Sequence, residues 1–332
     1  VPIIEEIKNL KIFKNDDNNN NILINGDNFY ALNVLNFTHK QKIDLIYIDP
    51  PYNTGNNDFI YNDRFVNNED GYKHSKWLSF MEKRLLLTLD LLNDGGLIFI
   101  SIDAHEFAQL KLLCDQIFGE HNFVENFIWV KNSTKNNSKT TSTNHEYILC
   151  YSKNIQNIRL NADYFRIKKP GFDEVMKLIK KEKALKTSPK DVEKKLDLLY
   201  KQNLEWKGIK SYCFVDADYN VYCPGDASSP GNVGKFYDIT HPITNKVCKT
   251  PTNGWRYTKQ TMDSLLKDNL IVFGKDETKV PLFKRILSKN KYEVMKSIII
   301  DNKDGRVELQ KIFQGGYKVW LSQTNHFNNQ IN

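Results

Sequence analysis

The stretch DLIYIDPPYNTGNNDFIYNDRF, residues 44–65, indicates most about the fold. It opens with an apolar run that ends on the acid Asp49. An apolar run with few polar interruptions is typical of a strand covered on both faces of a sheet. Pro50 and Pro51 follow directly, and each fixes its φ angle and removes a backbone N–H. We therefore expect a buried strand that leaves the sheet through a stiff corner and presents Asp49 and Tyr52 there.

Segments on both sides of this corner alternate between strand and helix patterns. Residues 22–35 predict a short strand, a Gly-Asp turn and a helix. Residues 75–92 have the apolar spacing of a helix, with Gly95 or Gly96 expected at its C-cap. Further elements are a helix at 105–119 and strands at 97–103, 127–132 and 146–153. This alternation predicts an α/β domain with a doubly wound sheet over residues 22–154.

The composition changes after this domain. Residues 170–208 are rich in lysine and contain two helical patterns. The second pattern begins with Ser188 as N-cap and Pro189 at the first helical position. Mixed turns and short apolar runs follow. We therefore place a boundary near residue 155 and expect a second, α+β domain over residues 155–300.

Charge and composition narrow the function classes. The 332 residues have a net charge of +7 and a sequence pI near 8.9, which is compatible with a nucleic-acid partner without establishing one. The five cysteines have no CxxC spacing, so neither zinc nor a disulfide framework is indicated, and His145-Glu146 has no partners in metal-ligand spacing. No run approaches the ~18 apolar residues of a membrane span. We expect a soluble, cytoplasmic protein.

The corner at Asp49 presents hydrogen-bond acceptors beside an aromatic ring. Its carboxylate and a backbone carbonyl of Pro50 or Pro51 form a small group of hydrogen-bond acceptors. Two acceptors suit the exocyclic amino group of a nucleobase, and the ring of Tyr52 offers a face on which a base stacks, worth ~1–3 kcal/mol. A base in a duplex reaches such a pocket only when it is extruded, at a cost of a few kcal/mol.

These residues spell DPPY, and the tetrapeptide resembles the catalytic motif of amino-group DNA methyltransferases, with Asp first as in adenine-N6 enzymes. Five blocks in order resemble the modification (Mod) subunits of type III restriction-modification systems. They are NGDNFYALNVL, IDPPYNTGNNDFIYNDRF, GGLIFISIDAHE, NHEYILCYSKN and NGWRYTKQTMDSLLKDNLIVFGKD. The blocks run from about residue 22 to 300, so the resemblance covers most of the chain.

The resemblance implies a Rossmann-like methyltransferase sheet with an inserted target-recognition domain at 155–300. The residues that would hold the target adenine are Asp49, Pro50, Pro51 and Tyr52. Asp27 and Asn28, together with Asp49, would lie beside the cofactor S-adenosylmethionine. The implied partners are double-stranded DNA, a second Mod copy in a homodimer, and a helicase-nuclease (Res) subunit. Neither a metal nor a membrane is implied.

Several residues have two interpretations each. Asp27 lies near the cofactor, or it caps the following helix, or both. Ser101 and Asp103 form a wall of the site, or Asp103 caps a helix. The candidate DNA contacts are Lys131, Lys135, Lys139, Trp255 and Arg256. Their alternatives are a solvated loop over residues 131–144 and a buried Trp beside a surface Arg. The lysine-rich helices contact phosphates, or they present an ordinary charged face.

One part of the family's pattern is not found in this sequence. The family places the cofactor half, with a Phe-x-Gly-x-Gly loop, after the recognition domain, and residues 301–332 contain no such loop. The strand that normally precedes this loop lies beside the DPPY strand, which would otherwise have an exposed apolar edge. We expect residues 1–21 to be a tether, residues 301–332 a tail, and the chain inactive alone. The alternative is a DNA-binding or partner-binding module without catalysis.

Overall fold

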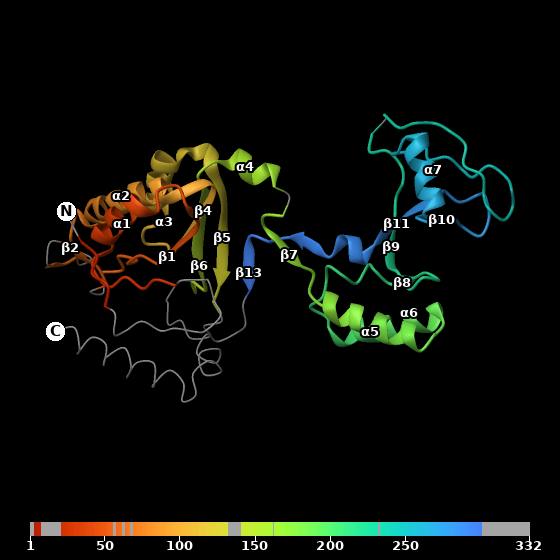
Figure 1. Cartoon of the computed structure of the whole chain (residues 1–332), viewed down its shortest axis with the longest axis horizontal. Helices are drawn as coiled ribbons and strands as arrows, with labels where there is room; N and C mark the ends of the chain where they lie inside the picture. Colours follow the sequence, from red (N-terminus) through yellow and green to blue (C-terminus); the bar gives the residue numbers. More distant parts are fainter. Residues whose placement is uncertain are drawn as a thin grey trace. The chain divides into compact units, whose positions relative to one another are not determined.

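The computed structural model describes residues 3–7, 21–55, 58–61, 64–66, 69–131, 141–161, 163–231 and 233–300, except for the side chains of 60, 61, 64 and 65. The chain divides into two compact units (Figure 1). The first consists of Val1–Tyr164 with Lys296–Asn332, and the second is Phe165–Met295. Within the described residues, no helix is both long and apolar enough to cross a membrane.

A five-stranded mixed sheet forms the centre of the first unit. Its strands, in spatial order, are β1 (Ile43–Ile48), β4 (Leu92–Ile102), β6 (His145–Ser152), β5 (Phe123–Val130) and β13 (Ile298–Ile300). β1 is parallel to β4, β13 is parallel to β5, and β6 is antiparallel to both of its neighbours. The ends of β1, β4 and β5 therefore meet at one edge of the sheet, together with the start of β6.

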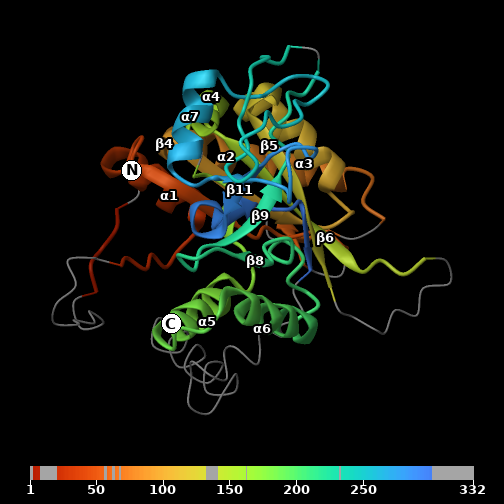
Figure 2. The same cartoon turned by 90° about the vertical axis from the view of Figure 1, so that its right-hand side faces the viewer.

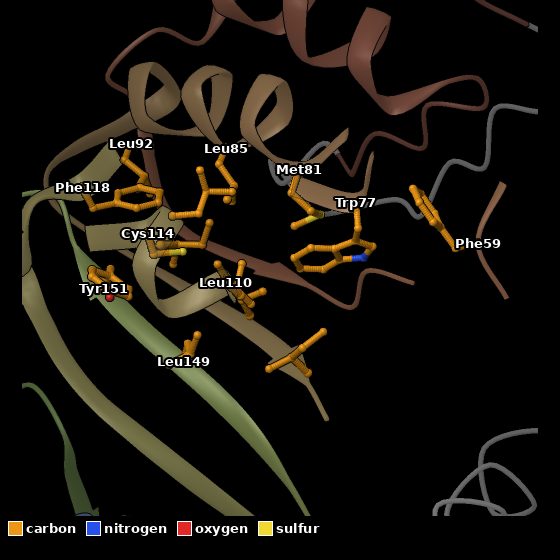
Figure 3. Packing of buried hydrophobic residues seen from close by; sticks show 14 of the residues in the cluster. Phe59, Trp77, Met81, Leu85, Leu92, Leu110, Cys114, Phe118, Leu149 and Tyr151 are labelled. Atoms are coloured by element: carbon orange, nitrogen blue, oxygen red, sulfur yellow. The ribbon is translucent and has the colours of Figure 1, made fainter. Parts of the chain in front are cut away.

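Helices pack against this sheet and complete the predicted α/β class, which is confirmed. They are α1 (Asn28–Thr38), α2 (Lys73–Leu91), α3 (Phe107–Cys114) and α4 (Ile155–Leu160). α3 continues as a π-helical turn, Asp115–Gly119, and a 3-10 turn, Glu120–Asn122, while β2 (Ile60–Tyr61) and β3 (Arg64–Phe65) form a short hairpin. The apolar faces of α2 and α3 share one buried core with β4 and β6, as Trp77, Leu85, Leu110 and Leu149 show in Figure 3.

Two local predictions are wrong. Residues 22–25 are not a strand. The glycines do not cap α2, which ends at Leu91, because Leu92 already has an extended backbone and begins β4. A Cβ on Gly96 would lie 2.9 Å from the Asn93 carbonyl oxygen and 3.0 Å from that of Ile43, so this glycine lets β4 approach β1 closely.

β1 also differs from its prediction, because it is not covered on both faces. It is an edge strand in the described sheet, with Leu45 57% and Tyr47 58% exposed. Ile46 and Ile48 alternate with these residues and pack against the core, and Ile43 also packs there, ahead of an irregularity in the strand. An uninterrupted apolar run therefore corresponds here to one packed face and one open face.

The second unit is built on two helices and a small antiparallel sheet. The helices α5 (Phe172–Ala184) and α6 (Pro189–Gln202) lie side by side (Figures 1 and 2). The sheet has the order β10 (Ile271–Val272), β11 (Leu282–Ile286), β9 (Val221–Gly225), β8 (Phe214–Val215). The remaining elements are β7 (Arg166–Lys168), α7 (Lys259–Lys267), the 3-10 turn Leu287–Asn290 and β12 (Tyr292–Val294), which pairs with β7. Ser188 caps α6 and Pro189 opens it, as predicted.

The units divide at different residues from those that the composition predicts. α4 belongs to the first unit, where its Ile155 and Ile158 are buried, so the chain leaves that unit after Tyr164 rather than near 155. It returns at Lys296, because β13 pairs with β5 in the first sheet. Residues 296–300 are therefore not part of the inserted domain. The expected tail at 301–332 and most of the tether at 1–21 lie outside the described residues.

Candidate active site

The DPPY corner begins where β1 ends, at the sheet edge described above. Asp49 is exposed, and the three residues after it are half-buried. Because β1 and β4 are parallel, their ends lie side by side, and the Tyr47 hydroxyl is 2.6 Å from the Ser101 hydroxyl. Asp103 follows β4 and accepts a hydrogen bond from the His105 backbone N–H at 2.9 Å. Ser101 thus lies beside the DPPY strand, and Asp103 stabilises a turn before α3 rather than capping the helix itself.

A helix holds the inner side of the corner. The indole N–H of Trp77 on α2 donates to the Pro51 carbonyl oxygen at 2.7 Å, and the Trp77 ring is fully buried. No described residue donates to the Pro50 carbonyl oxygen. Of the two proline carbonyls that the sequence leaves open as acceptors, that of Pro51 is engaged within the fold. The Pro50 carbonyl is the better candidate for a ligand.

A buried carboxylate fixes the residue directly after the tetrapeptide. Asn53 has a left-handed backbone with φ 57°, and its amide nitrogen donates to Glu106 Oε1 at 2.5 Å. His74 Nδ1 lies 2.7 Å from the same oxygen. Asn53 and Glu106 are both fully buried, and neither Asn53 Oδ1 nor Glu106 Oε2 has a hydrogen-bond partner among the described residues. A buried carboxylate depends strongly on the few partners that it has, so this link ties the corner to the β4–α3 turn.

Tyr52 and Asp49 interact with each other. Burial, followed by the interaction of the Tyr52 hydroxyl with the Asp49 carboxylate, raises the pKa of Tyr52 well above its ordinary value of 10.0. Tyr52 is therefore neutral near pH 7. A carboxylate has two oxygens with several lone pairs, so Asp49 retains acceptor capacity for a ligand.

The predicted cofactor turn begins α1. Asp27 caps this helix, because its carboxylate accepts the Phe29 N–H at 2.7 Å. Arg84 on α2 donates to Asn28 Oδ1 at 2.6 Å and lies 3.3 Å from Asp27 Oδ1. Burial lowers the pKa of Arg84, and the Asp27 carboxylate opposes this effect. Asp27 and Asn28 both remain exposed.

α2 relates the two predicted parts of the site. Trp77 holds the DPPY corner, and Arg84 holds the Asp27–Asn28 turn. Seven residues separate them, which is about two turns, or ~10 Å along the helix, and places them on one face. The tetrapeptide and the predicted cofactor turn are thus attached to the same side of one helix.

The predicted DNA contacts lie in different environments. Lys131 follows β5 at the same sheet edge and forms an ion pair with Glu146. Lys135 and Lys139 lie outside the described residues. Trp255 is fully buried in the second unit, and its indole N–H donates to the Tyr237 carbonyl oxygen at 3.0 Å. Trp255 is therefore part of the core and is not available to a base, whereas Arg256 is exposed.

Sequence reasoning missed the residues that hold the corner from inside. Trp77 has the apolar spacing of an ordinary core residue, so nothing in its position indicates a bond to Pro51. Glu106 and His74 are polar residues in helix-like segments, where solvent exposure is the default expectation. Asn53 gave the clearest signal, because Asn-Thr-Gly after two prolines favours a left-handed turn.

Comparison with known proteins identifies the family of this chain. A family model described as DNA methylase matches residues 43–313, which is more than half of the chain. The chain therefore belongs to the DNA methylase family. The predicted resemblance to type III Mod subunits is also confirmed. The Mod subunit of the type III restriction-modification enzyme EcoP15I from Escherichia coli is 35% identical over 326 residues, covering 89% of this chain and 49% of that protein.

Two further relatives and one solved structure are similar to parts of the chain. The StyLTI Mod subunit of Salmonella typhimurium is 30% identical over 342 residues, covering 94% of this chain and 46% of that protein. The type II methyltransferase M.KpnI of Klebsiella pneumoniae is 42% identical over 153 residues, covering 45% of this chain and 36% of that protein. The solved structure is that of the cytosine-N4-specific PvuII DNA methyltransferase, which is 15% identical with a TM-score of 0.30. The match covers 39% of this chain and 47% of that one. The chain spans about half the length of the Mod subunits that it matches.

Proposed function

We propose that this chain provides the target-base half of an adenine-N6 DNA methyltransferase of the type III Mod kind. The main supporting observation is that one proline carbonyl at the corner is engaged within the fold and the other is not. Trp77 occupies the Pro51 carbonyl, while the Asp49 carboxylate and the Pro50 carbonyl remain available outside the fold. Two acceptors on a rigid corner match the two N–H donors of an adenine amino group.

The residues of the corner have distinct roles in this proposal. Asp49 and the Pro50 carbonyl orient the amino group of an extruded adenine so that its nitrogen faces the methyl donor. The Tyr52 ring stacks on the base, and its hydroxyl holds one side of the Asp49 carboxylate. Orientation of this kind converts a bimolecular reaction into one between prepositioned groups.

The proposed cofactor is S-adenosylmethionine, which supplies the electrophilic methyl group. Asp27 and Asn28 would hold it, since both side chains are exposed and Arg84 fixes their turn on the same face of α2 as the corner. The exposed edge of β1 suits a further strand, as the family's cofactor half would provide.

The proposed partners of this chain are DNA and other protein subunits. The second unit would read double-stranded DNA, with the exposed Arg256 as a contact there and Lys131 as a contact at the sheet edge. Lys135 and Lys139 would extend the Lys131 contact along their loop. The Mod relatives are subunits of restriction-modification enzymes. We therefore propose that this chain forms a homodimer with a second Mod copy, binds a helicase-nuclease subunit and is located in the cytoplasm.

The decisive experiment measures transfer of a radiolabelled methyl group from S-adenosylmethionine to unmethylated duplex DNA. The product is digested and examined for N6-methyladenine. We expect transfer by a protein that contains both halves, and its loss by about 10²-fold or more in Asp49→Ala, because one of the two acceptors is removed. Methyl transfer that persists in Asp49→Ala would refute the role of the corner.

A second candidate function is DNA or partner binding without catalysis. The position of β1 at the edge of the described sheet, with Leu45 and Tyr47 exposed, favours it, because a partner could cover this edge. The same preparation separates the two functions. DNA binding with neither calorimetric binding of S-adenosylmethionine nor methyl transfer would support the binding module, whereas cofactor binding by the chain would support the enzyme.

A further inference from the structure

The helical hairpin of the second unit has one buried face and one strongly basic face. Between residues 172 and 202 there are nine lysine and six acidic side chains. Val175, Ile179, Val192 and Leu196 are buried between the helices and the rest of the unit. The charged residues therefore lie mostly on the outside of α5 and α6.

These lysines fall into two groups. Three form ion pairs within the fold: Lys194 with Asp191, Lys195 with the buried Glu182, and Lys201 with Asp197. Lys183 donates a hydrogen bond to the Asp218 carbonyl oxygen. Lys181 interacts electrostatically with Glu182. The remaining four are exposed and form no ion pair with any described residue. These four, Lys177, Lys180, Lys186 and Lys190, are termed the unpaired lysines.

The unpaired lysines occupy one stretch of the hairpin. Lys177 and Lys180 are on the solvent side of α5, opposite its buried residues Val175 and Ile179. Lys186 is in the turn between the helices, and Lys190 is in the first turn of α6. A lysine that already has a carboxylate partner adds little net field, whereas an unpaired lysine retains its full charge for an external partner.

We propose that the unpaired lysines bind the phosphate backbone of duplex DNA, away from the target adenine. This inference rests on the proposed function, because it assumes that the second unit meets DNA. It assigns this contact to a helical face that no part of the methylation chemistry requires. Phosphate contacts position a protein on the duplex without reading its sequence.

DNA fits this surface better than an acidic protein does. Lysine carries a compact charge on a flexible stem, which suits contact with regularly repeated phosphates and does not require a defined bidentate geometry. Each phosphate neutralised by a lysine releases condensed counterions, which gives a direct signature in the dependence of affinity on salt. An acidic polypeptide without condensed counterions would lack this steep dependence.

The test compares two variants with the same change in net charge. The first replaces the unpaired lysines: Lys177→Gln, Lys180→Gln, Lys186→Gln and Lys190→Gln. The matched control replaces four exposed lysines of the same unit that have aspartate partners: Lys168→Gln, Lys194→Gln, Lys201→Gln and Lys259→Gln. Binding of a mixed-sequence duplex of about 40 base pairs is measured by fluorescence anisotropy over a range of salt concentrations, where the slope counts phosphate contacts. Thermal unfolding checks that both variants remain folded.

We expect the slope of log K against log[salt] to become shallower by about 2 to 4 in the first variant, and by less than about 1 in the control. Equal changes in the two variants would overturn the inference, because net charge alone would then explain them. An unchanged slope would identify an ordinary solvated face. Weakened binding of polyglutamate with unchanged DNA binding would assign the surface to an acidic protein. Failure of the wild-type chain to bind DNA at low salt would instead refute the proposed function.

Discussion

The two sides of the DPPY corner are built in opposite ways. On the inner side, Pro51 is bonded to the buried Trp77, and Asn53 is bonded to the buried Glu106. On the outer side, Asp49 is exposed, the Pro50 carbonyl has no partner among the described residues, and β1 is an open edge. The hydrogen bonds that hold Pro51 and Asn53 are thus made to fully buried side chains.

This difference shows how a short loop can remain rigid while its acceptors stay available. The residues that hold the backbone are not the residues that would meet a base. A site with groups fixed before the ligand arrives avoids an ordering cost on binding. Substitutions on the inner and the outer side of the corner test this difference.

The inner side is tested most strongly by Glu106→Ala. The change removes a buried carboxylate and leaves the Asn53 amide nitrogen with only the Lys73 carbonyl oxygen, at 3.3 Å, as an acceptor. We expect the free energy of unfolding of the first unit to fall by about 2–4 kcal/mol, as measured by urea denaturation. The control Glu82→Ala, on the exposed face of α2, should change it by less than about 0.5 kcal/mol. Equal effects of the two substitutions would show that the buried link does not stabilise the corner.

Trp77→Phe tests the bond to the Pro51 carbonyl while keeping an aromatic ring in the core. We expect a loss of about 1–2 kcal/mol in the free energy of unfolding, with faster amide hydrogen exchange over residues 52–55. Trp255→Phe is a matched control, because it removes a buried indole hydrogen bond in the second unit. It should cost a similar free energy without changing exchange over residues 52–55. Faster exchange there in both variants would contradict a specific role for Trp77.

The outer side is tested by Tyr52→Phe, with the smallest expected effect. The interaction of the hydroxyl with Asp49 is lost, at a cost below about 1 kcal/mol near pH 7. The pKa of Tyr52 is raised in the folded state. The stability that Tyr52 contributes is therefore fully present below its ordinary pKa of 10.0 and is lost as the pH rises above that value. Tyr52→Phe should therefore lose less stability than the wild type between about pH 10 and 11. Parallel stability curves for the two proteins over this range would count against the raised pKa.

Local features of the fold were predictable from the sequence. Asp27 and Ser188 were expected as helix caps, and both accept hydrogen bonds from the first turn of their helices. The helix after the corner and the strand after it were also predicted, with errors of a few residues at their ends. Such features depend on residues within one or two turns of each other, so short stretches of sequence are enough to predict them.

The errors concern contacts between distant residues. Gly96 had the pattern of a helix cap, but its lack of a Cβ serves the approach of β4 to β1. Trp255 had the pattern of a base contact beside Arg256, but its ring is packed in the core. In both cases the local sequence permits two roles, and the neighbour that decides between them lies elsewhere in the chain.

Proline geometry and apolar patterning act locally, so the sequence alone predicts a strand that ends on Asp49 and continues as Pro-Pro-Tyr. The tertiary structure adds that Trp77 and Glu106 hold the corner from within and that residues 296–300 return to the first sheet. The reason is physical: burial, strand pairing and the choice of hydrogen-bond partner depend on segments far apart in the chain.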